Sequence, residues 1–263
     1  MPTLQRITLF PVKSLDGCEV TAATVLASGG LQHDRRWAIV DGDGVYINGK
    51  RSPTLHRIRA AFADDVQSVE LAAKGQRQSF GLPDEAKEIG RWLESVFGVE
   101  CRLIENHTGG FPDDDAAPGP TVVSTASLSA VGSWFGGMPL DEVRRRFRAN
   151  LEIDAPEPFW EDRFGADGGA GPRFAVGPVI FRGATICQRC PVPTRDSQTG
   201  EVWAGFARHF AERREASLPV WAPASQFDHF YRLAINTVLE SIDGGATIRV
   251  GDEVKLLDAS LID

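Results

Sequence analysis

The chain has 263 residues, of which 42% are hydrophobic and 24% charged, a composition typical of globular proteins with a sizeable core. Its formal net charge of -8 argues against a nucleic-acid partner and against binding to an anionic membrane surface. No stretch reaches the roughly 18–20 apolar residues that a spanning helix requires, and the first residues hold no leader-like apolar run. We therefore expect a cytoplasmic protein.

The N-terminal third is predicted to be rich in strands. Residues 4–10 alternate in polarity, and Pro11 ends that run. A hairpin with a glycine-containing loop at 41–44 is expected over 37–47. Helical spacing places the apolar residues of 84–97 on one face, with Gly98 as the stop. Further strands are expected over 20–26, 66–71 and 101–104.

Residues 107–120 mark the clearest boundary in the chain. They combine glycine, proline and three consecutive aspartates, which do not build a packed element. A loop of this length tends to be functional or mobile. We therefore predict two domains, over residues 1–118 and 119–263.

The C-terminal part mixes strands with short helices. A strand is expected over 121–123, followed by a helix to Phe135 that Ser124 or Thr125 caps. A second helix is predicted over 141–147, and a hairpin over 174–186 turning at 177–178 or at Gly183. Mixed or helical patterns follow at 201–214 and 228–239, with a tight hairpin over 247–257. The predicted fold class is α+β, mainly β with interspersed helices.

Four cysteines occur, and only Cys187 and Cys190 lie close together. Cys18 and Cys101 are interpreted as packing residues. A structural zinc site needs four ligands, and no second Cys-x-x-Cys is present. A thioredoxin-like pair normally opens a helix, which Pro191 disfavours here. The motif by itself is therefore compatible with a zinc site, with a redox pair and with two buried thiols.

Arginines and hydroxyl groups surround the two cysteines, at Arg189, Thr194, Arg195, Asp196 and Thr199. Arginines favour thiolate over thiol, and thiolate is the soft ligand that a thiophilic metal prefers. Guanidinium and hydroxyl groups are suited to hydrogen-bonding a phosphate or a pterin. A metal with an organic, phosphate-bearing ligand fits this neighbourhood better than zinc alone.

Three further segments carry basic groups and hydroxyls. They are residues 10–14 (FPVKS), 33–37 (HDRRW) and 145–150 (RRFRAN). Each one by itself is more typical of a solvated turn or surface cluster. Together with the cysteine motif they form a set suited to an anionic cofactor.

These segments resemble the MOSC family, specifically its members with an N-terminal β-barrel domain, such as the mitochondrial amidoxime reducing component and its bacterial relatives. FPVKS at 10–14 is similar to that family's YPVKS, and FRANL at 147–151 to its FRPNI. STASL at 124–128, CQRC at 187–190 and the C-terminal IRVGDEV at 248–254 also match. The resemblance implies an N-terminal β-barrel-like domain and a MOSC β-barrel domain with peripheral helices.

The resemblance also implies a molybdenum cofactor, Mo-molybdopterin, with Cys190 as the protein ligand to molybdenum. Asp196 would lie near the metal as a proton relay, so Cys190 and Asp196 are the expected catalytic residues. The expected cofactor-binding residues are Lys13, Ser14, Arg35, Ser124, Arg148, Asn150, Arg189 and Thr194.

The sequence departs from the family pattern at three places. Ala149 replaces a proline and Arg36 an aromatic residue, and a glycine-rich stretch at 165–172 would reshape substrate access. Cluster-ligand cysteines of an iron–sulfur domain are missing, so electrons are expected from a separate ferredoxin- or flavoprotein-type protein.

The expected activity is reduction of small N-hydroxylated compounds, such as amidoximes and hydroxylamines, by N–O cleavage. Two alternatives stay open. One is sulfur transfer through a persulfide on Cys190, and the other is a non-catalytic carrier of the cofactor.

Overall fold

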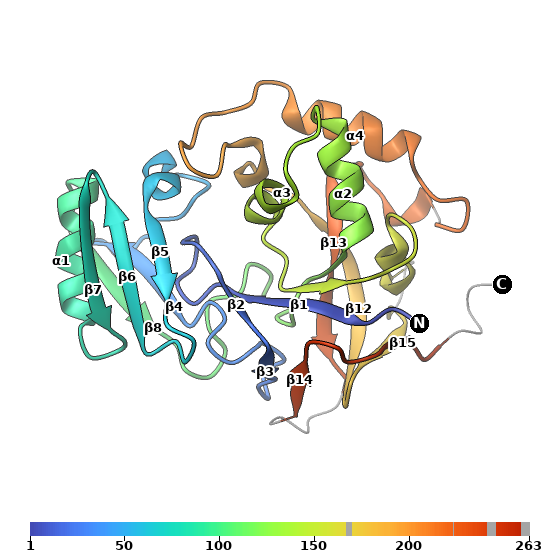
Figure 1. Cartoon of the computed structure of the whole chain (residues 1–263), viewed down its shortest axis with the longest axis horizontal. Helices are drawn as coiled ribbons and strands as arrows, with labels where there is room; N and C mark the ends of the chain where they lie inside the picture. The colour runs from blue at the N-terminus through green and yellow to red at the C-terminus, as the bar shows by residue number, and fades with distance from the viewer. Residues whose placement is uncertain (167–169, 223, 241–245, 259–263) are drawn as a thin grey trace.

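The computed structural model describes residues 1–166, 170–222, 224–240 and 246–258. It is an α+β structure, as the sequence predicts, with one large sheet and three small ones. Figure 1 shows α1 and β5–β7 at one end of the molecule and α2–α4 at the other. None of the helices in the described part has the length and apolar content that crossing a bilayer requires.

The large sheet has eight strands in the order β15-β11-β12-β13-β9-β10-β1-β2. Its pairs are antiparallel except for β9 with β10, which run parallel. The strands are β1 (Leu4–Leu9), β2 (Cys18–Val20), β9 (Val122–Ser124), β10 (Leu151–Ile153), β11 (Arg173–Val176), β12 (Val179–Gln188), β13 (Arg232–Leu239) and β15 (Val254–Leu256).

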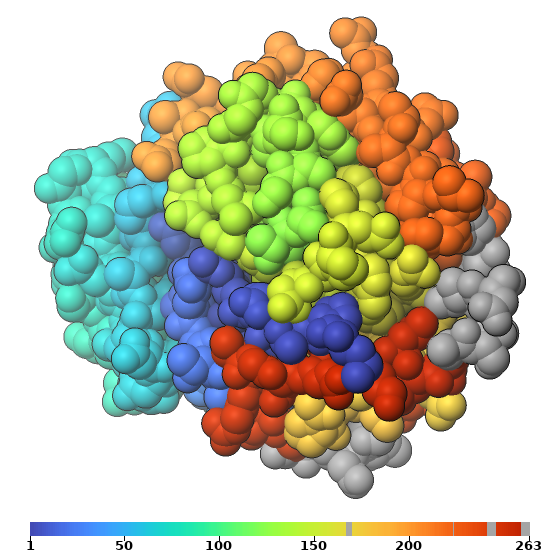
Figure 2. Space-filling model, turned by 45° about the vertical axis from the view of Figure 1, so that its right-hand side comes forward, coloured from blue at the N-terminus to red at the C-terminus, as the bar shows by residue number. Residues whose placement is uncertain are grey.

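The first residues of the chain therefore belong to the same sheet as the last strands. An isolated bridge joins Thr3 to Glu253, and Leu4 N–H donates to the Asp252 carbonyl at 2.8 Å. Figure 2 shows the N-terminal segment (blue) against the C-terminal one (red). No continuous ladder closes the described strands into a barrel.

Five of the remaining strands lie within residues 37–105, and we call this part of the molecule the N-terminal lobe. The other two strands pair with each other. β4 (Trp37–Asp41) pairs with β8 (Cys101–Glu105), and β14 (Thr247–Arg249) pairs with β3 (Ala22–Thr24). A three-stranded sheet joins β5 (Arg59–Phe62), β6 (Ser68–Ala73) and β7 (Gln76–Gly81).

The helices follow the sequence patterns closely. In α1 (Ala86–Phe97) the apolar face of the predicted helix is buried, and Gly98 ends it in the left-handed conformation at φ 75. Ser124 caps α2 (Thr125–Trp134) by accepting from Ser127 N–H, as predicted. The others are α3 (Leu140–Phe147), α4 (Phe206–Ala216) and the 3-10 turns η1 (Pro53–Arg57), η2 (Trp160–Phe164), η3 (Val192–Thr194) and η4 (Ala224–Gln226).

The structure corrects two expectations and modifies a third. Residues 247–257 do not form a hairpin, because β14 pairs with β3 and β15 with β11 across a turn at Gly251. Residues 232–239, which the pattern left mixed or helical, form strand β13 between β12 and β9. Trp37–Asp41 pairs mainly with β8, and its predicted hairpin partner contributes one bridge, Val40 to Tyr46. For β13–β15 a partner distant in sequence supplies the hydrogen bonds, whereas β4 also keeps two hydrogen bonds of the predicted hairpin, from Asp41 N–H to the Val45 carbonyl and from Ile47 N–H to the Ile39 carbonyl.

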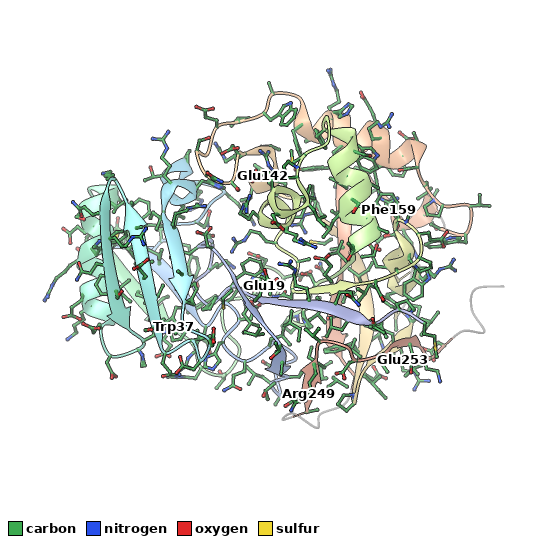
Figure 3. The ribbon with its side chains drawn as sticks, viewed as in Figure 1. Glu19, Trp37, Glu142, Phe159, Arg249 and Glu253 are labelled. Carbon is green, nitrogen blue, oxygen red and sulfur yellow. The ribbon has the colours of Figure 1, made fainter. Side chains whose placement is uncertain are left out.

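Separate cores support the two ends of the molecule. Trp37 and Leu93 belong to the core of the N-terminal lobe, and Phe159 belongs to an aromatic core under α2–α4 (Figure 3). A third core, which includes Ile7, Phe174 and Ile235, lies within the large sheet. Cys101 is buried in the N-terminal core, consistent with its interpretation as a packing residue.

Candidate functional site

A cavity of about 1100 Å³ lies between the N-terminal lobe and the large sheet. We call it the central cavity. It brings together residues that are up to 230 positions apart in the sequence, from Arg6 to Asn236. Seven of the predicted site residues line it, namely Lys13, Ser14, Arg35, Arg148, Asn150, Arg189 and Cys190.

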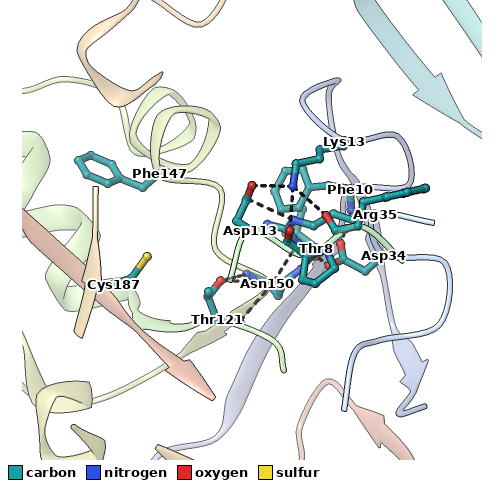
Figure 4. A network of polar contacts seen from close by, with 12 residues as sticks. Thr8, Phe10, Lys13, Asp34, Arg35, Asp113, Thr121, Phe147, Asn150 and Cys187 are labelled. Atoms are coloured by element: carbon teal, nitrogen blue, oxygen red, sulfur yellow. Dashed lines mark hydrogen bonds and ion pairs between the residues drawn. The ribbon is translucent and has the colours of Figure 1, made fainter. Parts of the chain in front are cut away.

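Lys13 and Ser14 lie on a turn that the neighbouring strand positions. Lys13 N–H donates to the Trp37 carbonyl at 2.8 Å, and Val12 forms a parallel bridge with Trp37. Ser14 adopts a left-handed conformation at φ 73, which turns the chain between β1 and β2. The Lys13 ammonium donates to the carbonyls of Phe111 and Pro112, each at 2.9 Å (Figure 4).

Arg35 is a cation that acidic and amide groups already surround. Its guanidinium pairs with Asp34, donates to Asn150 Oδ1 at 3.3 Å, and lies 3.6 Å from a carboxylate oxygen of Asp113. Its side chain is 12% exposed. Burial disfavours the charged form, but Asp34 and Asp113 outweigh burial and raise the pKa of Arg35. Arg35 is therefore held in place before any ligand binds.

Arg148 is the opposite case. It ends α3 in the left-handed conformation at φ 54, and its guanidinium lies over the Phe10 ring, 4.1 Å from the centroid. Within the described part of the chain, no hydrogen bond or ion pair reaches its side chain. Burial, together with repulsion from Arg35, lowers the pKa of Arg148 to about 10. The fold thus holds a cation beside the cavity that no described carboxylate contacts directly, while Asp16, Asp113 and Asp34 attract it from farther away.

Asn150 ties the walls of the cavity together. Its side-chain amide donates to the Thr8 carbonyl at 3.0 Å, while Oδ1 accepts from Arg35 and from the backbone and side chain of Thr121. Because these contacts use its polar atoms, Asn150 joins β1, the start of β9 and Arg35 rather than offering free groups to a ligand.

The two cysteines of the Cys-x-x-Cys motif both line the cavity at the end of β12. Arg189 donates to Cys187 Sγ at 3.1 Å and to the Phe147 carbonyl. Tyr231 donates its hydroxyl to the Cys190 carbonyl at 3.4 Å. Among the described residues, no group of three or more His, Cys, Asp and Glu side chains is placed to hold a metal ion. Arg189 therefore contacts Cys187 in this structure, and among the described residues no hydrogen bond reaches the Cys190 thiol.

The loop after Cys190 is held from two sides. From α3, Glu142 accepts from Ser197 N–H at 3.2 Å and from Arg146 at 2.6 Å (Glu142 is labelled in Figure 3). Arg146, 4% exposed, donates to the Pro193 carbonyl at 3.2 Å. From the N-terminal lobe, Arg59 donates to the Ser197 carbonyl at 3.1 Å. Both halves of the molecule therefore fix the segment that carries Cys190.

Three predicted site residues do not line the central cavity. The Ser124 side chain is buried as the cap of α2, and Thr194 donates to the Pro191 carbonyl at 2.7 Å. Asp196 accepts from the N–H groups of residues 198 and 199 at 3.0 and 2.8 Å. Burial opposes ionisation of Asp196, but those hydrogen bonds outweigh it and lower its pKa. A carboxyl with a lowered pKa is a poor proton donor, so the geometry offers no support for the relay role.

Four residues of the site were not anticipated as such. Asp113 and Asp114 line the cavity from the 107–120 loop, whose length was the only signal available in the sequence. Cys187 lines it beside Cys190, although the resemblance assigns a role to Cys190 alone. Tyr231 has no recognisable pattern around it, since only tertiary contact brings it to Cys190. The glycine-rich stretch at 165–172, expected to reshape substrate access, includes residues 167–169, which lie outside the described residues.

Comparisons with known proteins identify relatives along most of the chain. A Drosophila grimshawi molybdenum cofactor sulfurase is 29% identical over 238 residues, covering 76% of this chain and 29% of the relative. A Danio rerio molybdenum cofactor sulfurase is 26% identical over 265 residues, covering 82% and 31%. The chain thus spans less than a third of the length of these relatives.

The solved structures carry no argument here, whereas the family models give a clear result. A solution structure of a Bordetella bronchiseptica protein, 20% identical, covers 33% of this chain and 88% of its own with a TM-score of 0.25, which is too low to bear on the fold. By contrast, the model of the MOSC N-terminal beta barrel domain matches residues 1–92, and that of the MOSC domain matches residues 120–255. The chain belongs to the MOSC-domain family.

Proposed function

We propose that the central cavity binds a molybdenum cofactor, Mo-molybdopterin, and that Cys190 is the protein ligand to molybdenum. The observation that carries this proposal is the unpaired Arg148 guanidinium in a cavity that Cys190 also lines. An unbalanced cation stabilises an anion, and a cysteine thiolate is a soft metal ligand. A ligand with an anionic group and a thiophilic metal satisfies both features at once.

The residues present fit such a group. Lys13, Arg35 and Arg148 would hold its phosphate, and Ser14 offers a side-chain hydroxyl with no partner among the described residues. Arg189 would keep its contacts to Cys187 and the Phe147 carbonyl, and so position the cysteine segment. Asn150 would keep Arg35 and β1 in place. When bound, the molybdenum cofactor supplies two-electron redox chemistry.

We further propose that the substrates are small N-hydroxylated compounds, reduced by N–O cleavage with electrons from a separate ferredoxin- or flavoprotein-type protein. Support for the redox class comes from the resemblance of residues 10–14, 147–151 and 187–190 to the amidoxime reducing component and its bacterial relatives. The chain's own contribution is to fix the Cys190 carbonyl through Tyr231 and to hold the following loop through Glu142 and Arg59. These contacts limit the positions that the thiolate can adopt.

A second candidate is sulfur transfer, with Cys190 carrying sulfur as a persulfide. The specific observation in its favour is that the relatives matched over 76–82% of this chain are molybdenum cofactor sulfurases. The contact of Arg189 with Cys187 Sγ places a second thiol beside a cation in the same cavity. Under this alternative, thiol chemistry continues in preparations that lack molybdenum.

The test is the molybdenum and pterin content of protein made in a molybdenum-competent host, measured for wild type, Cys190→Ser and Cys187→Ser. We expect wild type and Cys187→Ser to hold molybdenum and Cys190→Ser to lose it. Wild-type protein without molybdenum or pterin would overturn the proposal. Turnover of a model amidoxime with an artificial reductant then separates the reductase from a non-catalytic carrier, and a persulfide on Cys190 detected by mass spectrometry in metal-free protein would favour sulfur transfer.

A further inference from the structure

The 107–120 loop reaches into the central cavity and contacts its cations. The Lys13 ammonium binds three oxygens of this loop, namely two backbone carbonyls at 2.9 Å and an Asp113 carboxylate oxygen at 3.0 Å. The other Asp113 oxygen lies 3.6 Å from Arg35 Nε. Figure 4 shows the Asp113 carboxylate between these two cations. A single carboxylate of the chain therefore bridges two of the three cations expected to hold the cofactor phosphate.

The three consecutive aspartates of this loop differ in what they contact. Asp114 accepts from Ala116 N–H at 3.0 Å and from the Asn236 amide at 3.3 Å, so it shapes the loop. Asp115 is exposed and does not line the cavity, and no contact to its side chain occurs among the described residues. Asp113 alone pairs with the cavity cations.

Asp113 projects into the cavity, and the interior does not enclose it. Its side chain is 58% exposed although two cations lie within 4 Å, because the cavity itself is open to solvent. Burial opposes its ionisation, but Arg35 and then Lys13 outweigh burial and lower the pKa of Asp113. The group therefore stays a full carboxylate near neutral pH, in a place that a ligand could also reach.

A carboxylate and a phosphate monoester accept from the same donors. Both use oxygen atoms carrying negative charge, and both bind lysine and arginine through charge-assisted hydrogen bonds. We infer that Asp113 is a built-in competing anion: it occupies the Lys13 and Arg35 donors until an incoming phosphate group displaces it. This inference rests on the proposed function, and it adds a means by which the chain controls access to that site.

The loop is anchored on both sides of Asp113, so displacement needs only a short segment. Before it, Phe111 N–H donates to the Arg35 carbonyl at 2.8 Å, and Gly110 packs so closely on the Asp34 carbonyl that a Cβ would lie 2.9 Å from it. After it, Gly119 N–H donates to the Thr237 carbonyl at 2.9 Å. Freeing one donor of Lys13 and the Nε of Arg35 therefore requires movement near Asp113 and no opening of the fold, and the contacts of Lys13 with the Phe111 and Pro112 carbonyls are kept.

Inorganic phosphate is the probe for the experiment, titrated calorimetrically at an ionic strength of about 0.15 M into wild type, Asp113→Asn and Asp115→Asn. The Asp115 variant is the matched control, because it removes the same charge from the same loop without touching Lys13 or Arg35. We expect Asp113→Asn to bind phosphate about tenfold more tightly than wild type, since one charged hydrogen-bond competitor is removed. Asp115→Asn should stay within about twofold of wild type, as expected for a change in distant charge.

Equal affinities for Asp113→Asn and Asp115→Asn would overturn the inference, because the effect would then be net charge alone. Weaker binding by Asp113→Asn would overturn it too, by making Asp113 a support of the site. Thermal unfolding accompanies each titration, and Asp113→Ser provides a second variant with the charge removed if the asparagine variant does not fold.

The result of the phosphate titration can be told apart from the result of the test of the proposed function. Phosphate affinity needs no cofactor, whereas the proposed function is tested by molybdenum and pterin content. A tenfold gain for Asp113→Asn in a protein that never acquires molybdopterin would support the competing anion and overturn the cofactor. Molybdopterin in the wild type, together with no gain in phosphate affinity for Asp113→Asn, would support the proposed cofactor and overturn the competing anion.

Discussion

Arg35 and Arg148 flank the same phenylalanine ring and yet have different surroundings. Arg35 lies 5.3 Å and Arg148 4.1 Å from the Phe10 centroid. Arg35, on the N-terminal wall of the cavity, has Asp34, Asp113 and Asn150 as partners, whereas Arg148, on the α3 wall, has none among the described residues. On the N-terminal wall, the protein's own carboxylates therefore fix the Arg35 guanidinium. On the α3 wall, the Arg148 guanidinium is available to pair with an anionic group of a ligand.

The largest expected effect on stability follows from Arg35→Gln. It leaves the largely buried Asp34 carboxylate without its cation and Asp113 with Lys13 alone, so we expect the free energy of unfolding to fall by about 2 kcal/mol. Chemical denaturation measures it. The matched control is Arg36→Gln, because Arg36 pairs with Glu105 outside the central cavity. An equal loss in both variants would show that the N-terminal wall has no special organisation.

Glu142→Gln tests the α3 side of the cysteine loop. Glu142 accepts from Ser197 and Arg146, so its neutralisation should lower the free energy of unfolding by about 1 kcal/mol. It should also speed alkylation of Cys190 several-fold, because the loop after it loosens. Glu212→Gln, which removes an exposed charge on α4, is the control and should change neither quantity. Unchanged alkylation in Glu142→Gln would mean that α3 does not position Cys190.

Arg148→Gln should separate binding from stability. Since Arg148 has lost hydration without gaining a partner, its removal should change the free energy of unfolding by less than about 0.5 kcal/mol or raise it. Phosphate affinity should nevertheless fall about tenfold, as expected for one charged hydrogen bond. Calorimetric titration and denaturation measure the two quantities. A large loss of stability would mean that Arg148 makes a stabilising contact in the folded protein, and would contradict its availability to a ligand.

The smallest effect concerns pH. The pKa of Arg148 is lowered to about 10 in the folded protein, below the ordinary arginine value, so the unfolded chain binds more protons in alkaline solution. Unfolding free energy should therefore rise with pH through this group as pH passes 10. Wild type compared with Arg148→Gln, denatured between pH 8 and pH 11, isolates the contribution. A wild-type stability that stays constant or falls relative to that of Arg148→Gln as the pH passes 10 would contradict the lowered pKa.

Local sequence signals predicted the elements that depend on local physics. The apolar face of 84–97, the cap at Ser124 and the turn at Gly177 each act within a few residues, and each is observed. The C-terminal hairpin was wrong for the complementary reason. Alternation indicates a strand but does not name its partner, and β14 and β15 pair with strands about 225 and 80 residues away.

The candidate site shows the same division. Motifs and their resemblance to the MOSC family pointed to Lys13, Ser14, Arg35, Arg148, Asn150, Arg189 and Cys190, and the structure gathers these residues around one cavity. It leaves Ser124, Thr194 and Asp196 off that cavity. Ser124 caps a helix, as its place in the sequence predicts, and Thr194 and Asp196 shape a turn. The resemblance assigned them to the cofactor because it does not show that these local contacts keep the three side chains off the cavity.

By itself, then, the sequence determined the residue types of the site, the α+β class and the family. Only the tertiary structure decided which cations are paired. Asp113 follows Lys13 by 100 positions and Arg148 follows Phe10 by 138, so their contacts depend on how the N-terminal lobe and the large sheet close around the cavity. The burial and the pairing of these charged side chains depend on distances in space, which the packing of the N-terminal lobe against the large sheet sets and the spacing along the chain does not.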